Sequence, residues 1–180
     1  MKRVMLLVTI LSHLVLMAAA AEKMIVVLVR ADIDEDPQFV NTTNIIRRYT
    51  TAPYFSFDLI ITTHQTLSNL KLQAVYTVRT GQVDNILYNR KIDFCVFLKR
   101  PTERMVKMVF DDIKRYAKPR MPASCPVEPT AISLRNMSLN HVTLPSFLPQ
   151  TNFQLQINFW EGRYSVFRSR WHGRLKKISV

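Results

Sequence analysis

Phe153-Gln154-Leu155-Gln156-Ile157-Asn158-Phe159 alternates strictly between apolar and polar side chains. This period of two is typical of a β-strand with one buried face and one wet face, because successive side chains point to opposite sides. The run ends at Trp160-Glu161-Gly162-Arg163, and a second patterned run follows. A glycine between two such runs predicts a tight hairpin turn. The stretch therefore favours an antiparallel, mainly β fold.

Other segments alternate in the same way or form short apolar runs of strand length. They cover residues 24–30, 55–62, 70–78, 92–98 and 132–139. The segment 92–98 is included because every second residue from Ile92 to Leu98 is apolar. Strands of this number and length predict a two-sheet antiparallel β-sandwich.

One segment has helical periodicity instead. Its apolar side chains fall on one face at 3.6 residues per turn, at Met105, Val106, Val109, Phe110, Ile113 and Tyr116. Thr102 is placed to cap the helix start, and Pro119 to end it. We therefore expect one α-helix, near residues 102–117, beside the strands.

The N-terminus has the pattern of a secretory signal peptide. Lys2 and Arg3 precede an apolar run, and the small residues Ala18 to Ala21 suit a cleavage site. We predict a signal peptide over residues 1–21 and a single secreted domain over residues 22–180, with no membrane span after cleavage. The alternative is an uncleaved anchor, although the run is barely long enough. Either way, the remainder faces the outside.

The composition is basic, with 25 Lys and Arg residues against 13 Asp and Glu and a formal net charge of +12. A cytosolic protein of this charge would suggest nucleic acid. For a secreted protein we expect no nucleic-acid partner, and the available polyanions are glycosaminoglycans and anionic lipid headgroups. The alternative is that the charge only keeps the protein soluble.

Two cysteines and two sequons agree with secretion. Cys95 and Cys125 form an even count, which in an oxidising compartment predicts one disulfide. Asn41 and Asn136 begin Asn-x-Ser/Thr sequons and are candidate glycosylation sites. Asn136 shares its parity with the apolar Leu134, whereas a glycan must face water. Either the register breaks after Leu134 or this sequon is unused.

No enzyme is predicted. The histidines outside the signal peptide lack metal-ligand spacing, and neither a Gly-x-Ser-x-Gly elbow nor a glycine-rich phosphate loop occurs. We therefore expect no catalytic residue, metal or cofactor. The acidic run from Asp32 to Asp36 resembles a calcium loop, but Pro37 and Thr43 stand where such a loop needs Gly and Glu. We interpret the run as a solvated loop.

The C-terminal segment predicts a strand with one cationic face. Its charged side chains share one parity and give a candidate basic surface of Arg168, Arg170, Arg174 and Lys176, with His172 between them. The apolar Phe167, Trp171 and Leu175 share the other parity. The alternative is a sheet edge that charge protects against aggregation.

Two residues complicate this strand. Val166 has the parity of the arginines and could not also face the core, so a bulge near Val166 is predicted. Gly173 is a candidate break in the strand, which would interrupt the cationic row.

The second half of the chain resembles a family of small secreted insect proteins catalogued as a domain of unknown function. The resemblance lies in the run from Asn85 to Leu98, in Cys125-Pro126, in the strand that begins at Ile132, in the stretch from Leu144 to Pro149, and in the alternation from Phe153 to Phe159. It covers roughly Asn85 to Val180. The family is related to CheB-type chemosensory proteins and is similar, through them, to ganglioside-activator and lipid-recognition β-sandwiches.

The resemblance implies a cup-like sandwich that holds a lipid or another hydrophobic small molecule, with a role in chemosensation. Candidate cavity residues are Phe55, Phe57, Leu59, Phe153, Leu155, Ile157 and Phe159. The alternative is that these side chains form an ordinary core. The expected function is thus non-enzymatic ligand binding. A cationic extracellular module for glycosaminoglycan, an anionic membrane or a receptor protein is the alternative.

Overall fold

The computed structural model describes residues 22–48, 55–139 and 150–179. The predicted signal peptide and the stretch from Leu144 to Pro149 lie outside them. The strands are β1 (Glu22–Glu35), β2 (Val40–Arg48), β3 (Phe55–Thr63), β4 (Leu70–Thr80), β5 (Val83–Asp93), β6 (Ala117–Lys118), β7 (Ala131–Met137), β8 (Asn152–Glu161) and β9 (Tyr164–Ser179). The helices are α2 (Phe94–Lys99) and α3 (Arg104–Tyr116).

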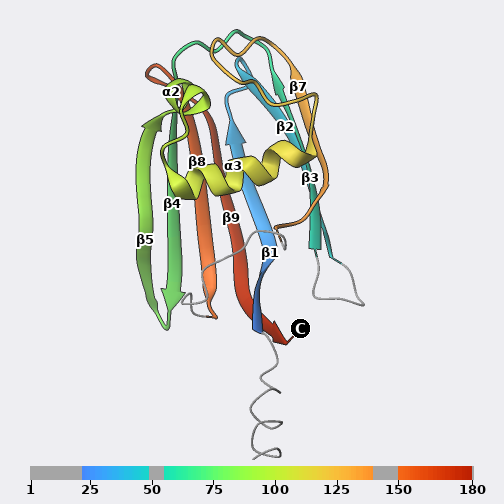
Figure 1. The fold of residues 1–180 in the computed structure, drawn as a ribbon, viewed down its shortest axis with the longest axis vertical. Coiled ribbons are helices and arrows are strands. Elements are labelled where there is room, and N and C mark those ends of the chain that lie inside the picture. Colours follow the sequence, from blue (N-terminus) through green and yellow to red (C-terminus); the bar gives the residue numbers. More distant parts are fainter. Residues whose placement is uncertain (1–21, 49–54, 140–149, 180) are drawn as a thin grey trace, which may run out of the picture.

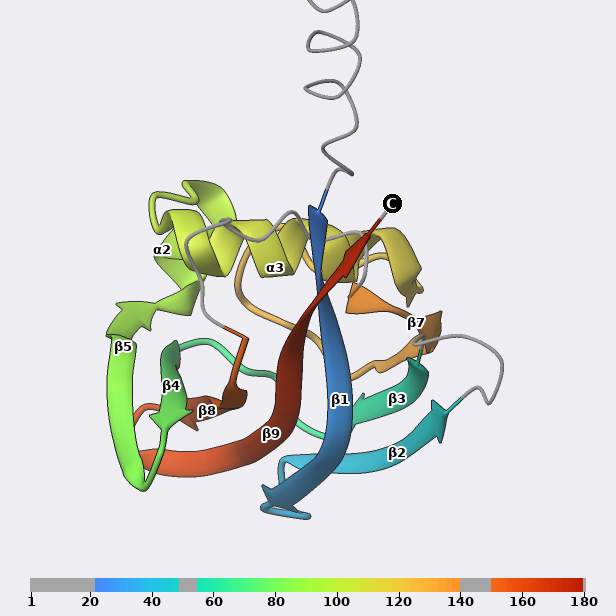
Figure 2. The ribbon, with the colours of Figure 1, turned by 90° about the horizontal axis from the view of Figure 1, so that it is seen from below.

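The strands form two antiparallel sheets, which confirms the predicted mainly β sandwich. One sheet has five strands in the order β1-β9-β8-β4-β5, and the other has four in the order β2-β3-β7-β6. Helix α3 runs across the strand directions, on the side of the five-stranded sheet where the four-stranded sheet also lies (Figures 1 and 2). The five-stranded sheet therefore has an inner face toward α3 and the second sheet, and an outer face toward water.

The predicted β8–β9 hairpin is confirmed. Glu161 pairs with Tyr164, and Gly162 between them has a φ of +59°, which glycine adopts without strain. Further along, Phe159 pairs with Phe167 but Trp160 pairs with Ser165, so Val166 is the extra residue of a bulge. This is the bulge that the parity conflict predicted, and it leaves Val166 1% exposed.

Gly173 does not break the strand, contrary to one prediction. Strand β9 continues through it, pairing with Leu28 of β1 on one side and Phe153 of β8 on the other. The missing side chain makes room for the ring of Phe153.

The prediction of a strand over 92–98 is wrong beyond Asp93, because α2 begins at Phe94. Asp93 caps the helix, its Oδ1 accepting a hydrogen bond of 2.9 Å from the backbone N–H of Val96. Phe94 and Phe97 are three residues apart and both buried, whereas Val96 is exposed. The apolar residues thus fit a helical turn as well as an alternation, and the described residues form two helices rather than one.

The predicted disulfide between Cys95 and Cys125 is present, spanning a sequence separation of 30 residues. It joins α2 to the irregular segment that follows β6. Helix α3 therefore lies inside the covalently closed loop.

Candidate binding surfaces

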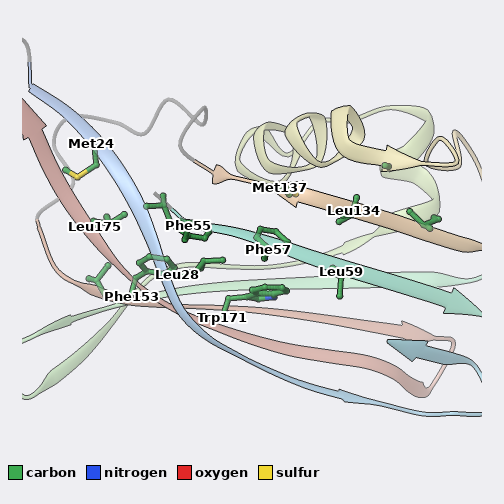
Figure 3. Packing of buried hydrophobic residues seen from close by; sticks show 14 residues of the cluster. Met24, Leu28, Phe55, Phe57, Leu59, Leu134, Met137, Phe153, Trp171 and Leu175 are labelled. Carbon is green, nitrogen blue, oxygen red and sulfur yellow. The ribbon is translucent and has the colours of Figure 1, made fainter. Parts of the chain in front are cut away.

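The seven candidate cavity residues fall into two groups. Phe55, Phe57 and Leu59 of β3 and Phe153 of β8 are buried in one core cluster. Figure 3 shows them together with Trp171 and Met137 between the layers. The ring centroids of Phe57 and Trp171 lie 5.2 Å apart, so the two rings are in contact. These four side chains fill the core.

The other three residues lie on β8, the central strand of the five-stranded sheet, and are only half-buried. Leu155 packs at the margin of the same cluster, whereas Ile157 and Phe159 pack against a second cluster that includes Phe94 of α2. Tyr76 of β4 pairs with Leu155 and is also half-buried. We call Tyr76, Leu155, Ile157 and Phe159 the inner strip. It is apolar surface on the inner face that its neighbours only partly cover.

Burial raises the pKa of Tyr76 to about 12. Its hydroxyl group is neutral at physiological pH, as it would be at the ordinary pKa near 10, and burial strengthens that preference. The inner strip thus carries one uncharged polar group beside its apolar side chains.

The predicted basic residues lie on the outer face of β9. Arg168, Arg170, Arg174 and Lys176 are exposed, while the intervening odd-numbered residues from 167 to 175 are buried. Strand β9 pairs with β1 on one side and β8 on the other. The interpretation as a charge-protected sheet edge is therefore wrong.

The acidic run is also not a loop, because β1 extends to Glu35. Asp34 pairs in register with Arg168, and Asp32 with Arg170. Arg168 forms an ion pair with Asp34 at 2.5 Å, and Asp32 Oδ2 lies 3.3 Å from His172 Nε2. Arg168 and His172 of β9 thus lie beside carboxylates of β1, which are part of a strand and not of a solvated loop.

Three of the four predicted basic residues remain outside these pairs. Within the described part of the chain, Arg170, Arg174 and Lys176 form no ion pair with a carboxylate. Two of them have amides as neighbours on β8, since Gln156 pairs with Arg170 and Asn152 with Arg174. The outer face therefore sets a row of amides beside a row of cations.

Two depressions lie on this outer face. The larger, about 420 Å³, we call the outer recess; it is lined by Asp32, Ile33, Asp34, Gln156, Asn158, Arg168 and Arg170. The smaller, about 230 Å³, is lined by Asp34, Glu35, Asp36, Ser165 and Arg168. Both share Asp34 and Arg168, so the ion pair of these residues stands between them.

The asparagines of both sequons, Asn41 and Asn136, are on the four-stranded sheet and exposed. Leu59 pairs with Leu134 but Phe57 with Met137, so the register breaks after Leu134, as one of the two sequence alternatives required. Asn136 sits in this bulge with a φ of +52°. Glycosylation at Asn41 and Asn136 stays a prediction.

The bulge also binds a carboxylate. The backbone N–H of Asn136 donates to Asp58 Oδ1 at 2.7 Å, and Arg47 pairs with Oδ2 at 2.6 Å. The hydrogen bond from Asn136, followed by the contact with Arg47, holds the pKa of Asp58 below its usual value.

The residues that the structure describes contain no group of His, Cys, Asp and Glu side chains that could hold a metal ion. None of the helices among these residues combines the length and the apolar character that a bilayer crossing requires.

Together, the fold and these surfaces define a two-sheet β-sandwich that contains one disulfide and has a polar, charged outer face. Residues 69–155 match the family described as "Protein of unknown function (DUF1091)". The match extends from the start of β4 into β8 and contains both cysteines. It confirms the resemblance to an uncharacterised-domain family. None of the curated proteins compared with the chain matches it.

Proposed function

We propose that this chain is a secreted, non-enzymatic binding protein for a hydrophobic small molecule or lipid. The observation that supports this function is the inner strip. Leu155 and Ile157 face into the sandwich from its central strand, yet they keep part of their surface exposed. An ordinary core would bury apolar side chains at such a position.

Covering this strip would stabilise a complex. Removal of apolar surface from water contributes about 25 cal/mol per Å². Tyr76 would sit beside the ligand with a neutral hydroxyl group, which can donate a hydrogen bond to a polar headgroup. An amphipathic ligand with a long apolar part fits this combination best.

The secreted location is part of the proposal. It is supported by the predicted signal peptide and by the cysteine pair, since disulfides persist mainly in oxidising compartments. A role in chemosensation rests on the resemblance to chemosensory relatives.

The test begins with native mass spectrometry and lipid extraction of the protein secreted from insect cells. A defined co-purifying lipid is expected. Saturable displacement of an apolar fluorescent dye by that lipid should follow. Failure to bind any lipid class or the dye would exclude the function.

A pair of matched variants locates the site. Ile157→Trp should abolish dye binding by filling the space over the inner strip, while Ile45→Trp should leave it unchanged, because Ile45 is 50% exposed on the other sheet. Equal binding by both variants would show that the ligand lies elsewhere. Circular dichroism checks that each variant is folded.

A second candidate function is a cationic extracellular module for glycosaminoglycan, an anionic membrane or a protein partner. It is supported by the exposure of Arg170, Arg174 and Lys176 and by their lack of ion pairs among the described residues. Such binding should weaken steeply with salt, because screening acts within about 8–10 Å at physiological ionic strength. Retention on heparin that does not depend on salt would contradict it.

A further inference from the structure

We propose that the outer face of β8 and β9 binds an acidic oligosaccharide and recognises its hydroxyl groups as well as its charge. The proposal rests on the second candidate function and specifies its ligand. The site is the outer recess with the adjoining part of β9.

The outer recess has unused hydrogen-bonding capacity. Gln156 and Asn158 line it and are half-buried, and their side-chain amides form no hydrogen bond with the described residues. A primary amide offers two donors and a carbonyl acceptor. By contrast, the amide of Gln73, on β4 of the same sheet, donates to Asn89 at 2.9 Å. The free amides suit a ligand that is rich in hydroxyl groups.

The outer recess carries charges of both signs. Arg170 lies beside Gln156 and is exposed, so its guanidinium group is available to a carboxylate or sulfate, which it can bind with two parallel hydrogen bonds. The carboxylates of Asp32 and Asp34 line the same recess and can only accept hydrogen bonds when ionised. They attract hydroxyl groups and repel any anionic group, whether phosphate, sulfate or carboxylate, so a ligand must place hydroxyl groups beside them. A bare polyanion or an anionic bilayer therefore fits this recess less well than an acidic sugar does.

The spacing of the side chains on β8 and β9 also favours such a ligand. Adjacent strands lie about 4.8 Å apart, and outward-facing side chains on one strand about 6–7 Å apart, so the amide and cation rows form a regular grid. The recess of about 420 Å³ is within the usual size range of small-ligand sites. Because β9 is paired on both sides, the grid is held rigidly before any ligand binds.

The experiment separates hydroxyl recognition from charge. Binding of a heparin-derived octasaccharide and of a polyphosphate of similar charge is measured by calorimetry at physiological salt. The double variant Gln156→Ala/Asn158→Ala changes no charge. It should weaken octasaccharide binding about tenfold, as expected for the loss of two hydrogen bonds, and leave polyphosphate binding unchanged. Gln73→Ala is the matched control and should change neither.

Each outcome is decisive. If the double variant binds the octasaccharide as tightly as the wild type does, or if both probes bind alike, hydroxyl recognition is excluded. Tighter binding to phosphatidylserine vesicles than to the octasaccharide would assign the face to membranes instead. If no anionic probe binds at all, the second candidate function itself fails, and lipid binding at the inner strip is unaffected by that result.

Discussion

Gly173 of β9 lies directly against the ring of Phe153 of β8. A Cβ atom built on Gly173 would stand 2.5 Å from the Phe153 Cε1 and Cζ atoms and 2.8 Å from the carbonyl oxygen of Val27. No real side chain tolerates such distances, and the Val27 oxygen belongs to the backbone of β1. The ring of Phe153 reaches the core because this one position has no side chain.

Gly173→Ala should therefore lower the free energy of unfolding by about 1–3 kcal/mol, as expected for overpacking in a dense core. Urea unfolding measures the change. Combining it with Phe153→Leu, which removes the ring, should reduce the added cost of the alanine. An equal cost in both backgrounds would place the strain at Val27 rather than at the ring.

Ser169→Ala should destabilise the core through Trp171. The indole Nε1 donates to the Ser169 Oγ at 3.0 Å in a buried position, and Ser169 Oγ in turn donates to the carbonyl oxygen of Ile157 at 3.3 Å. Loss of the acceptor leaves a buried N–H group unpaired, at a cost of about 1–3 kcal/mol. Thermal unfolding followed by tryptophan fluorescence provides the measurement. Ser165→Ala on the same strand is exposed and should have no effect.

Asp58 should make stability depend on acid pH. Its pKa is lowered in the folded state, so its contribution is present above the unfolded-state pKa, near 4, and is lost as the pH falls below it. Asp58→Asn should therefore be less stable than the wild type at pH 7, with a difference that shrinks toward pH 2. Unfolding free energies of both proteins across this range test the expectation. A difference that does not vary with pH would mean that the carboxylate's charge plays no part.

Reduction of the Cys95–Cys125 bridge should destabilise the fold by about 3–4 kcal/mol, the chain-entropy estimate for a closed loop of this size. The double variant Cys95→Ser/Cys125→Ser should match the reduced protein in thermal unfolding. If the reduced protein and the variant melt at the same temperature as the oxidised wild-type protein, the bridge does not constrain the unfolded chain measurably.

Much of the fold follows from local sequence pattern. The alternation from Phe153 to Phe159 predicts β8, the conflicting parity at Val166 predicts a bulge, and the conflict at Asn136 gives a register break as one of two alternatives. These predictions succeed because the inward or outward direction of a strand residue is a local property. Helix α2 was missed because the short apolar run from Phe94 to Leu98 fits both periods, and only the packing of Phe94 and Phe97 decides between them.

The binding surfaces were less predictable, because they depend on which strands are neighbours. The basic residues of β9 were visible in the sequence. The pairing of Arg168 with Asp34 was not, because these residues are 134 positions apart and meet only through the pairing of β9 with β1. The polar face of β8, with Gln154, Gln156 and Asn158, was likewise predictable only as an alternation in the sequence. Its position between the cations of β9 and strand β4 comes only from the strand order.

The placement of both sequons on one sheet has a consequence for how the molecule meets its surroundings. Asn41 and Asn136 lie on β2 and β7, so glycans attached there would shield one broad side and leave the opposite side, with β8 and β9, bare. The glycosylated protein would then have one shielded side and one bare side, and it would approach other molecules in one orientation.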